Sequence, residues 1–211
     1  MADIQLDTEA NPATPSSGSG ILLFNSTNKE LTTVDDAGNV RLVRTLTNAN
    51  NADVVASAAD TYLTGSAITV PPQLVRVGSR FRWQFAMSKT GAGTATPIWS
   101  VRIGTAGTVS DTARLTFTGV AQTANADNGW AEIDVIVRTI GASGVIAGVY
   151  NITKASSSST LGLTNQQSDV KQVTSSTFDL TVPNLIFGVS CNPGASGVWT
   201  FQHVGVQATN L

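Results

Sequence analysis

The chain has 211 residues and a formal net charge of -2 at pH 7, and only 12% of its residues are charged, about half the share in ordinary soluble domains. It holds no run of Lys and Arg, so we expect neither a nucleic-acid partner nor insertion into a membrane. The single cysteine, Cys191, excludes an intrachain disulfide and a paired-thiol metal site. The N-terminus lacks the charged and apolar regions of a secretory signal.

The first 44 residues divide into two parts. Residues 1–20 are rich in Pro, Ser, Gly and Asn, which predicts an extended arm. Residues 21–44 hold three short strand-like segments separated by the turn sequences STNK and DDAGN, which predicts a β-meander. A meander this small buries too little apolar surface to stand alone. We therefore expect it to pack on the next domain or on neighbouring chains, as an attachment or oligomerisation module.

Residues 45–60 are ambiguous, because their alanines favour a helix while Asn and Thr oppose one. We predict a linker that leads into a strand, with a short helix as the alternative. From residue 61 to residue 211 the strand patterns are continuous. No alternation of strands and helices suggests a parallel sheet. About eight strands with long loops predict an antiparallel β-sandwich, jelly-roll-like, rather than a closed barrel.

Alternation of apolar and polar residues indicates which side chains face the core. In 80–89 the inward residues are aromatic or large, in 98–104 Trp99 and Val101 oppose Ser100 and Arg102, and in 131–138 Asp134 and Arg138 face outward. Further strands are predicted at 66–70, 73–77, 113–122 and 144–154, and three more at 176–182, 185–191 and 197–211. Residues 155–171 are expected to form a long polar loop. The predicted inward residues of the first and third strands are Phe81, Trp83, Phe85, Met87, Ala131, Ile133, Val135 and Val137.

Catalytic residue types are scarce. His203 is the only histidine, so any Ser-His-Asp or histidine-based metal site would need it. Alternation places it on one face with Phe201 and Gly205, as a structural strand residue. Cys191 ends an apolar strand and is expected to be an inert thiol; a pair with His203 across adjacent strands is conceivable, but no motif supports it.

Carboxylates offer one pair of interest. Glu132 and Asp134 lie two residues apart on a strand and so share a face, and a glycoside hydrolase needs two such groups. We interpret them as a solvent-facing polar edge in which Arg138 could pair with Asp134. Two turn segments carry oxygen ligands that calcium could use, but neither has the EF-hand pattern. We expect no catalytic, cofactor-binding or metal-binding residues. The two segments contain Asp35, Asp36 and Asn39, and Asn125, Asp127 and Asn128.

Four tryptophans remain, and in a sandwich most such residues lie in the core. Trp130 follows the turn-rich loop TANADNG, so it is the one most expected to be exposed. An exposed indole could stack on the apolar face of a sugar ring. The other three are Trp83, Trp99 and Trp199.

Two segments resemble tailed-phage virion proteins. The first joins a small-residue lead, Ser17–Gly20, to an apolar strand and Asp-x-x-Gly-x-Val from Asp35, as in modules near the N-termini of fibre and minor structural proteins. The second resembles β-sandwich domains of phage particles, through Arg-x-Gly-Thr-x-Gly-x-x-x-Asp from Arg102 to Asp111 and the segment from Asn192 to Thr200. The resemblance implies homotrimers with intertwined N-terminal modules.

Together these features lead us to expect a non-enzymatic structural protein of a tailed-phage virion, a trimeric fibre, spike or capsid-decoration protein. Its N-terminal module would anchor it to capsid, neck or tail proteins, and its sandwich would project outward. The alternative is a carbohydrate-binding module for host-surface glycans, with the loops TANADNG and ASSSSTLGLTNQQSD as the rim of its site. A more remote alternative is a small glycan depolymerase that uses Glu132 and Asp134.

Overall fold

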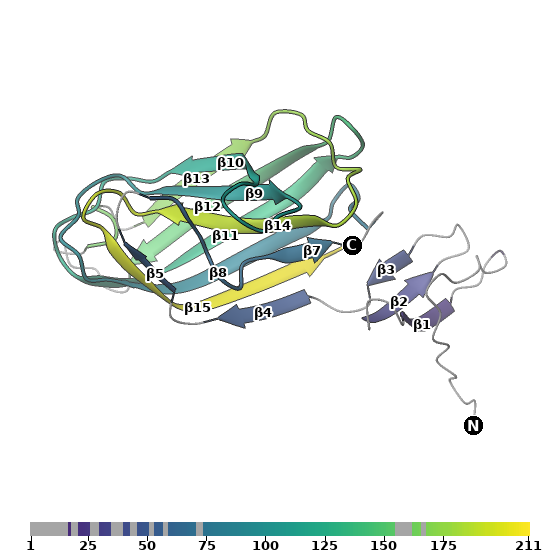
Figure 1. The fold of residues 1–211 in the computed structure, drawn as a ribbon, viewed down its shortest axis with the longest axis horizontal. Helices are drawn as coiled ribbons and strands as arrows, with labels where there is room; N and C mark the ends of the chain where they lie inside the picture. The colour runs from purple at the N-terminus through teal and green to yellow at the C-terminus, as the bar shows by residue number, and fades with distance from the viewer. Residues whose placement is uncertain are drawn as a thin grey trace, which may run out of the picture.

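The fold is taken from a computed structural model of residues 1–211 (Figure 1). It describes residues 17, 21–25, 30–34, 40–42, 46–50, 53–56, 59–70, 74–154, 162–165 and 168–211. The predicted arm at 1–20, apart from residue 17, lies outside these residues, as does the calcium candidate formed by Asp35, Asp36 and Asn39. No helix occurs among the described residues, so none there could span a membrane.

Two antiparallel sheets form a β-sandwich (Figure 1), as predicted. The large sheet has the order β13-β12-β11-β8-β15-β4, with β5 also paired to β15. The small sheet has the order β10-β9-β14-β6, with β7 also paired to β14. The large sheet comprises β4 (Leu46–Asn50), β5 (Asp53–Ala56), β8 (Arg80–Lys89), β11 (Asp127–Thr139), β12 (Val145–Lys154), β13 (Ser168–Thr174) and β15 (Val198–Thr209). The small sheet comprises β6 (Thr61–Tyr62), β7 (Ile68–Val70), β9 (Ile98–Gly104), β10 (Thr112–Thr118) and β14 (Leu185–Asn192).

The strand pairs are nested along the chain. At the centre β9 pairs with β10, outside them β8 pairs with β11, then β6 and β7 pair with β14, and finally β4 and β5 pair with β15. This is one long antiparallel ribbon rolled up so that β15 also meets β8 and β14 also meets β9. Such rolling defines a jelly roll. The hairpin of β12 and β13 extends the large sheet beyond β11.

The core between the sheets is aromatic. Phe81 of β8 stacks on Phe187 of β14, with ring centroids 4.0 Å apart and planes at 7°, and so joins the two layers. Trp99 of β9 contacts the rings of Phe85 and Tyr150 of the opposite sheet. All the side chains predicted to face inward on β8 and β11 are buried. The alternation was therefore sufficient to identify the core face of these strands.

Several predicted boundaries differ from the structure. Residues 176–182 form no regular strand and make only an isolated bridge at Phe178, and residues 74–77, the described part of the strand predicted at 73–77, form none. The end of the predicted polar loop instead supplies β13, which pairs with β12. Most residues of β13 are polar, including the buried Asp169. The strand therefore lacks the alternation of apolar and polar residues from which strands are predicted. The segment 45–60, predicted as a linker that leads into a strand, contains two strands, β4 and β5, and both pair with β15.

The predicted meander is present as a small antiparallel sheet in the order β1-β2-β3. β1 (Ile21–Asn25) pairs with β2 (Glu30–Val34), and β2 pairs with β3 (Val40–Leu42). Among the described strands, these three pair only with one another (Figure 1). The role of this small sheet in attachment or oligomerisation stays a prediction.

Candidate functional site

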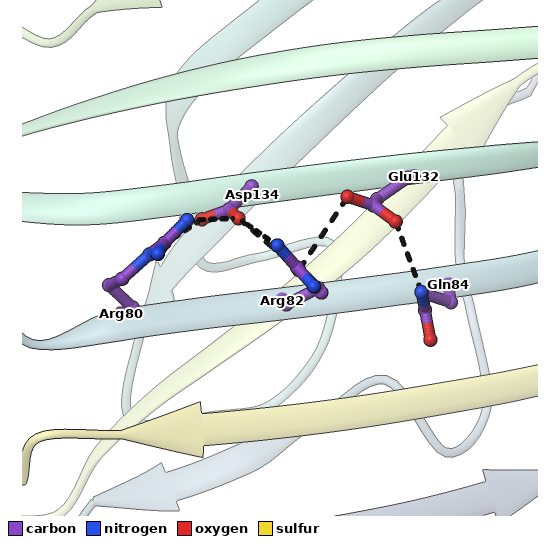
Figure 2. Close-up of polar contacts among 5 residues, drawn as sticks. All are labelled: Arg80, Arg82, Gln84, Glu132 and Asp134. Atoms are coloured by element: carbon purple, nitrogen blue, oxygen red, sulfur yellow. Dashed lines mark hydrogen bonds and ion pairs between the residues drawn. The ribbon is translucent and has the colours of Figure 1, made fainter.

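A ladder of polar side chains lines the outer face of the large sheet, between β8 and β11 (Figure 2). The register places Gln84 opposite Glu132 and Arg82 opposite Asp134. Both strands turn every second residue toward the core, as the burial of Trp83 shows, so their other residues must face outward. The alternation that buries the aromatic core therefore also builds this outer row.

The ladder is continuous from amide to guanidinium. Gln84 Nε2 donates to Glu132 Oε2 at 3.0 Å, and Glu132 Oε1 lies 3.5 Å from Arg82 Nε. Arg82 Nη2 and Arg80 Nη2 donate to Asp134 Oδ2 at 2.9 and 2.6 Å. Its hydrogen bond with Asp134 raises the pKa of Arg82 above its ordinary value. The carboxylate pair found in the sequence therefore accepts hydrogen bonds from one amide and two guanidinium groups. Arg138 is exposed beyond this end of the ladder.

Trp130 extends the ladder on β11 and is 40% exposed, whereas Trp83, Trp99 and Trp199 are fully buried. This confirms the prediction from the sequence. Its ring lies nearly parallel to that of His203 on β15, at 17° and with centroids 6.3 Å apart. Both residues flank Ala86 of β8, which is too small to separate them.

Gly205 leaves room for the imidazole of His203. A Cβ atom at this glycine would lie 2.9 Å from His203 Nε2, so a side chain there would displace the ring. The exposed indole and the imidazole beside it together form an aromatic platform on the sheet, here defined as Trp130 and His203.

A small hollow of about 210 Å³ lies at the other end of the ladder. Its lining offers guanidinium donors, carboxylate acceptors, an amide and a hydroxyl, since it comprises Arg80, Arg82, Asp134, Gln207 and Thr209. Gln207 and Thr209 belong to β15, so three strands contribute to it. We refer to the ladder, the aromatic platform and this hollow together as the outer strip.

The position of His203 corrects one prediction. Alternation placed it on the same face as Phe201, but Phe201 is buried and His203 is exposed. The register shifts between these residues, and this β-bulge turns every later side chain of β15 over. Cys191 is fully buried on β14 of the small sheet, where desolvation raises the pKa of its thiol. Cys191 faces the core from the small sheet and His203 is exposed on the large sheet, so they form no catalytic pair.

In the second calcium candidate, the oxygen atoms of Asp127 and Asn125 already accept hydrogen bonds from other groups of the protein. Asp127 is buried, and its carboxylate accepts the backbone N–H groups of Asn128 and Leu163 at 2.8 and 3.0 Å. The carbonyl of Asn125 accepts a hydrogen bond from Lys89 Nζ at 3.2 Å. Desolvation lowers the pKa of Lys89, while the charge of Asp127 opposes that shift. Within the described residues, no three His, Cys, Asp or Glu side chains gather as a metal site would require.

The two loops that were expected to form the rim of a binding site contact one another. The segment around residue 163 packs on the TANADNG loop, with Thr123 donating its N–H to the carbonyl of Gly162 at 3.0 Å. Their described backbone groups therefore bind one another.

Arg102 and Asp111, the ends of the second resembling motif, form a clamp on the outer face of the small sheet. Arg102 Nη1 donates to the carbonyls of Val109 and Asp111 at 2.9 and 2.6 Å, and Nη2 pairs with Asp60. The Asp111 carboxylate accepts the N–H groups of Ala106 and Gly107 at 3.0 and 2.7 Å. Gly107 has a φ of 64°, which a glycine adopts without strain. The motif therefore fixes a loop.

Tyr62 covers the sheet beside this clamp. A Cβ atom at Gly188 would lie 1.8 Å from the Tyr62 hydroxyl, so the ring lies directly on that glycine. The hydroxyl is buried and has no hydrogen-bond partner in the described part of the chain. Desolvation and the nearby charge of Asp111 raise the pKa of Tyr62 to about 12.

No family model matches the sequence, and no curated protein matches it. Solved structures similar to this chain include the CBM2 module of the evolved Dit of Lactobacillus casei BL23 phage J-1, at 12% identity and a TM-score of 0.32, over 80% of this chain and 99% of that one. A legume lectin-like domain from Entamoeba histolytica aligns at 10% identity and a TM-score of 0.25, over 74% and 89%. The infectious bursal disease virus Gx strain aligns at 16% and 0.21, over 85% and 51%. At these TM-scores the alignments identify no ligand and no residue role.

Proposed function

We propose that this chain is a non-enzymatic structural component of a tailed-phage virion, trimeric and attached through its N-terminal module. The observation that carries the proposal is the clamp: Arg102 and Asp111, which carry the resemblance to phage particle proteins, hold a loop by four hydrogen bonds with its backbone, and Arg102 also binds Asp60 and Ser190. The clamp fixes the shape of a loop, which suits a structural protein. The jelly roll is also an architecture of viral capsid proteins.

Assembly and location test this proposal separately. Light scattering of the full chain should give about three times its 21.8 kDa mass, and antibody labelling should locate it on phage particles. A stable monomer that never sediments with particles would contradict the proposal. The small β1-β2-β3 sheet supports assembly, because a sheet of this size needs a packing partner.

The second candidate function is carbohydrate binding for host attachment, which a virion protein could combine with its structural role. The specific observation is the exposure of Trp130 beside His203, on a face that also offers ordered hydrogen-bonding side chains. Carbohydrate sites need both features, since a sugar ring has apolar C–H faces and an edge of hydroxyls. A glycan array probed with the full chain should show binding. An array without any bound glycan would remove this candidate and leave the structural proposal intact.

We do not extend the proposal to a depolymerase. Asp134 receives two guanidinium groups and Glu132 receives an amide and a guanidinium (Figure 2). This arrangement suits ligand binding better than proton donation. If purified chain cleaves a polysaccharide and Glu132→Gln abolishes the cleavage, the non-enzymatic proposal is wrong.

A further inference from the structure

The outer strip is longer than one sugar. Trp130 and Asp134 are four residues apart on β11, which separates them by about 13 Å at the usual rise of a strand. The aromatic platform lies at one end of this interval and the 210 Å³ hollow at the other. Glu132 and Gln84 lie between them, joined by their 3.0 Å hydrogen bond. A ligand that uses both ends must therefore be elongated along β8 and β11.

The hydrogen-bonding groups of the strip are ordered before a ligand arrives. Arg80 and Arg82 each use Nε and Nη2 for Asp134. Nη1 of neither guanidinium bonds to another residue in the described part of the chain, so each keeps donors for a ligand. Carboxylate oxygens accept more than one hydrogen bond, and a sugar hydroxyl both donates and accepts. Side chains fixed in this way lose little conformational freedom on binding.

The charges of the ladder balance. Arg80 and Arg82 contribute two positive charges, and Glu132 and Asp134 contribute two negative charges, so their sum is zero. An acidic sugar that used the free Nη1 donors would bring a negative charge beside Glu132 and Asp134, and Asp134 already pairs with both guanidiniums at 2.6 and 2.9 Å. A neutral sugar can bind without separating these ion pairs. The balance therefore favours a neutral ligand.

We infer that the outer strip binds a neutral oligosaccharide lengthwise, with one sugar packed on Trp130 and another hydrogen-bonded in the hollow of Arg80, Arg82 and Asp134. This inference rests on the carbohydrate-binding function proposed above and names its ligand class and orientation. The sugar between these two lies over Gln84 and Glu132. Affinity therefore depends on chain length as well as on sugar identity.

The test uses a glycan array that carries neutral, sulfated and uronic-acid glycans of graded length, followed by calorimetric titration of the best-bound series. We expect neutral glycans to bind, with at least a tenfold gain in affinity from the monosaccharide to the trisaccharide. Asp134→Asn should remove most of that gain and leave the monosaccharide affinity within about twofold. The control Asp179→Asn changes an exposed carboxylate that bonds only to Thr181 in the described residues, so it should bind as the parent does.

The outcomes separate the two proposals. Binding of acidic glycans alone, equal affinity for one and three sugars, or an Asp134→Asn variant that keeps the length gain would overturn the lengthwise neutral site while carbohydrate binding stands. If no glycan binds at all, the carbohydrate-binding function itself fails. Unfolding midpoints of each variant identify any loss that arises from misfolding.

Discussion

The two outer faces of the sandwich use the same residue types for different purposes. On the small sheet, the Arg102 side chain is 16% exposed and its donors bind backbone carbonyls, Ser190 and Asp60. On the large sheet, Arg80 and Arg82 are 53% and 39% exposed and bind carboxylates on an open face. The difference lies in the donors that remain available. Those of Arg102 bind other groups of the protein, whereas Arg80 and Arg82 keep donors that can bind a ligand.

Truncating the clamp should have the largest effect. Arg102→Ala leaves the carbonyls of Val109 and Asp111 and the carboxylate of Asp60 without their cation, and removing one partner of such a partly buried pair costs about 3 kcal/mol. Urea unfolding measures this loss. The matched control, Arg138→Ala, removes an exposed guanidinium and should change stability by less than about 0.5 kcal/mol. Equal losses of stability from the two substitutions would contradict the proposed difference between the two faces.

A pair of glycines, one on each face, gives the next comparison. Gly188→Ala places a methyl group 1.8 Å from the Tyr62 hydroxyl, in a covered layer, and overpacking of this kind costs about 2 kcal/mol. Gly205→Ala meets only the tip of His203, an exposed side chain that can move, so its cost should stay below about 0.5 kcal/mol. Thermal unfolding distinguishes them. A larger loss for Gly205→Ala would mean that the large-sheet face is the more tightly packed one.

Alkaline unfolding tests the covered face in another way. The pKa of Tyr62 is about 12 when folded and 10.0 when unfolded, so the folded chain holds this proton where the unfolded chain loses it. Its contribution to stability is complete below pH 10 and is lost as the pH rises from 10 to 12. Tyr62→Phe should make that decline shallower and leave stability at pH 7 nearly unchanged, since the hydroxyl has no partner. Denaturant titrations between pH 10 and pH 12 measure this decline in stability. An identical decline in the variant and the parent would contradict the prediction. Tyr150 and Cys191, whose pKa values burial also raises, contribute to the remaining decline.

A small change in stability is expected from breaking the ladder itself. Arg82→Ala removes a partly exposed ion pair with Asp134, and such pairs contribute less than about 1 kcal/mol. Urea unfolding at low and high salt checks this, because screening should reduce the difference further. A loss of several kcal/mol would show that the ladder supports the fold rather than a ligand.

The sequence alone predicted the sandwich and the core of β8 and β11, because their alternation is clean and their inward residues are aromatic or branched. It also singled out Trp130 as the exposed tryptophan. It missed β13, whose polar residues pair through the backbone, and it placed His203 on the wrong face because one bulged residue reverses the alternation. The residues that β8 and β15 contribute to the outer strip were not predicted, because the register that aligns Gln84 and Arg82 with β11, and Gln207 with Arg82, is a tertiary property.

The most direct test of the two faces measures stability and glycan binding on the same pair of variants. We predict that Trp130→Ala abolishes binding on a glycan array and keeps the unfolding free energy within about 1 kcal/mol of the parent, since the indole is partly exposed. We predict that Arg102→Ala, assayed where it remains folded, loses stability but binds the same glycans as the parent chain. Binding that survives Trp130→Ala and disappears in folded Arg102→Ala would contradict the account.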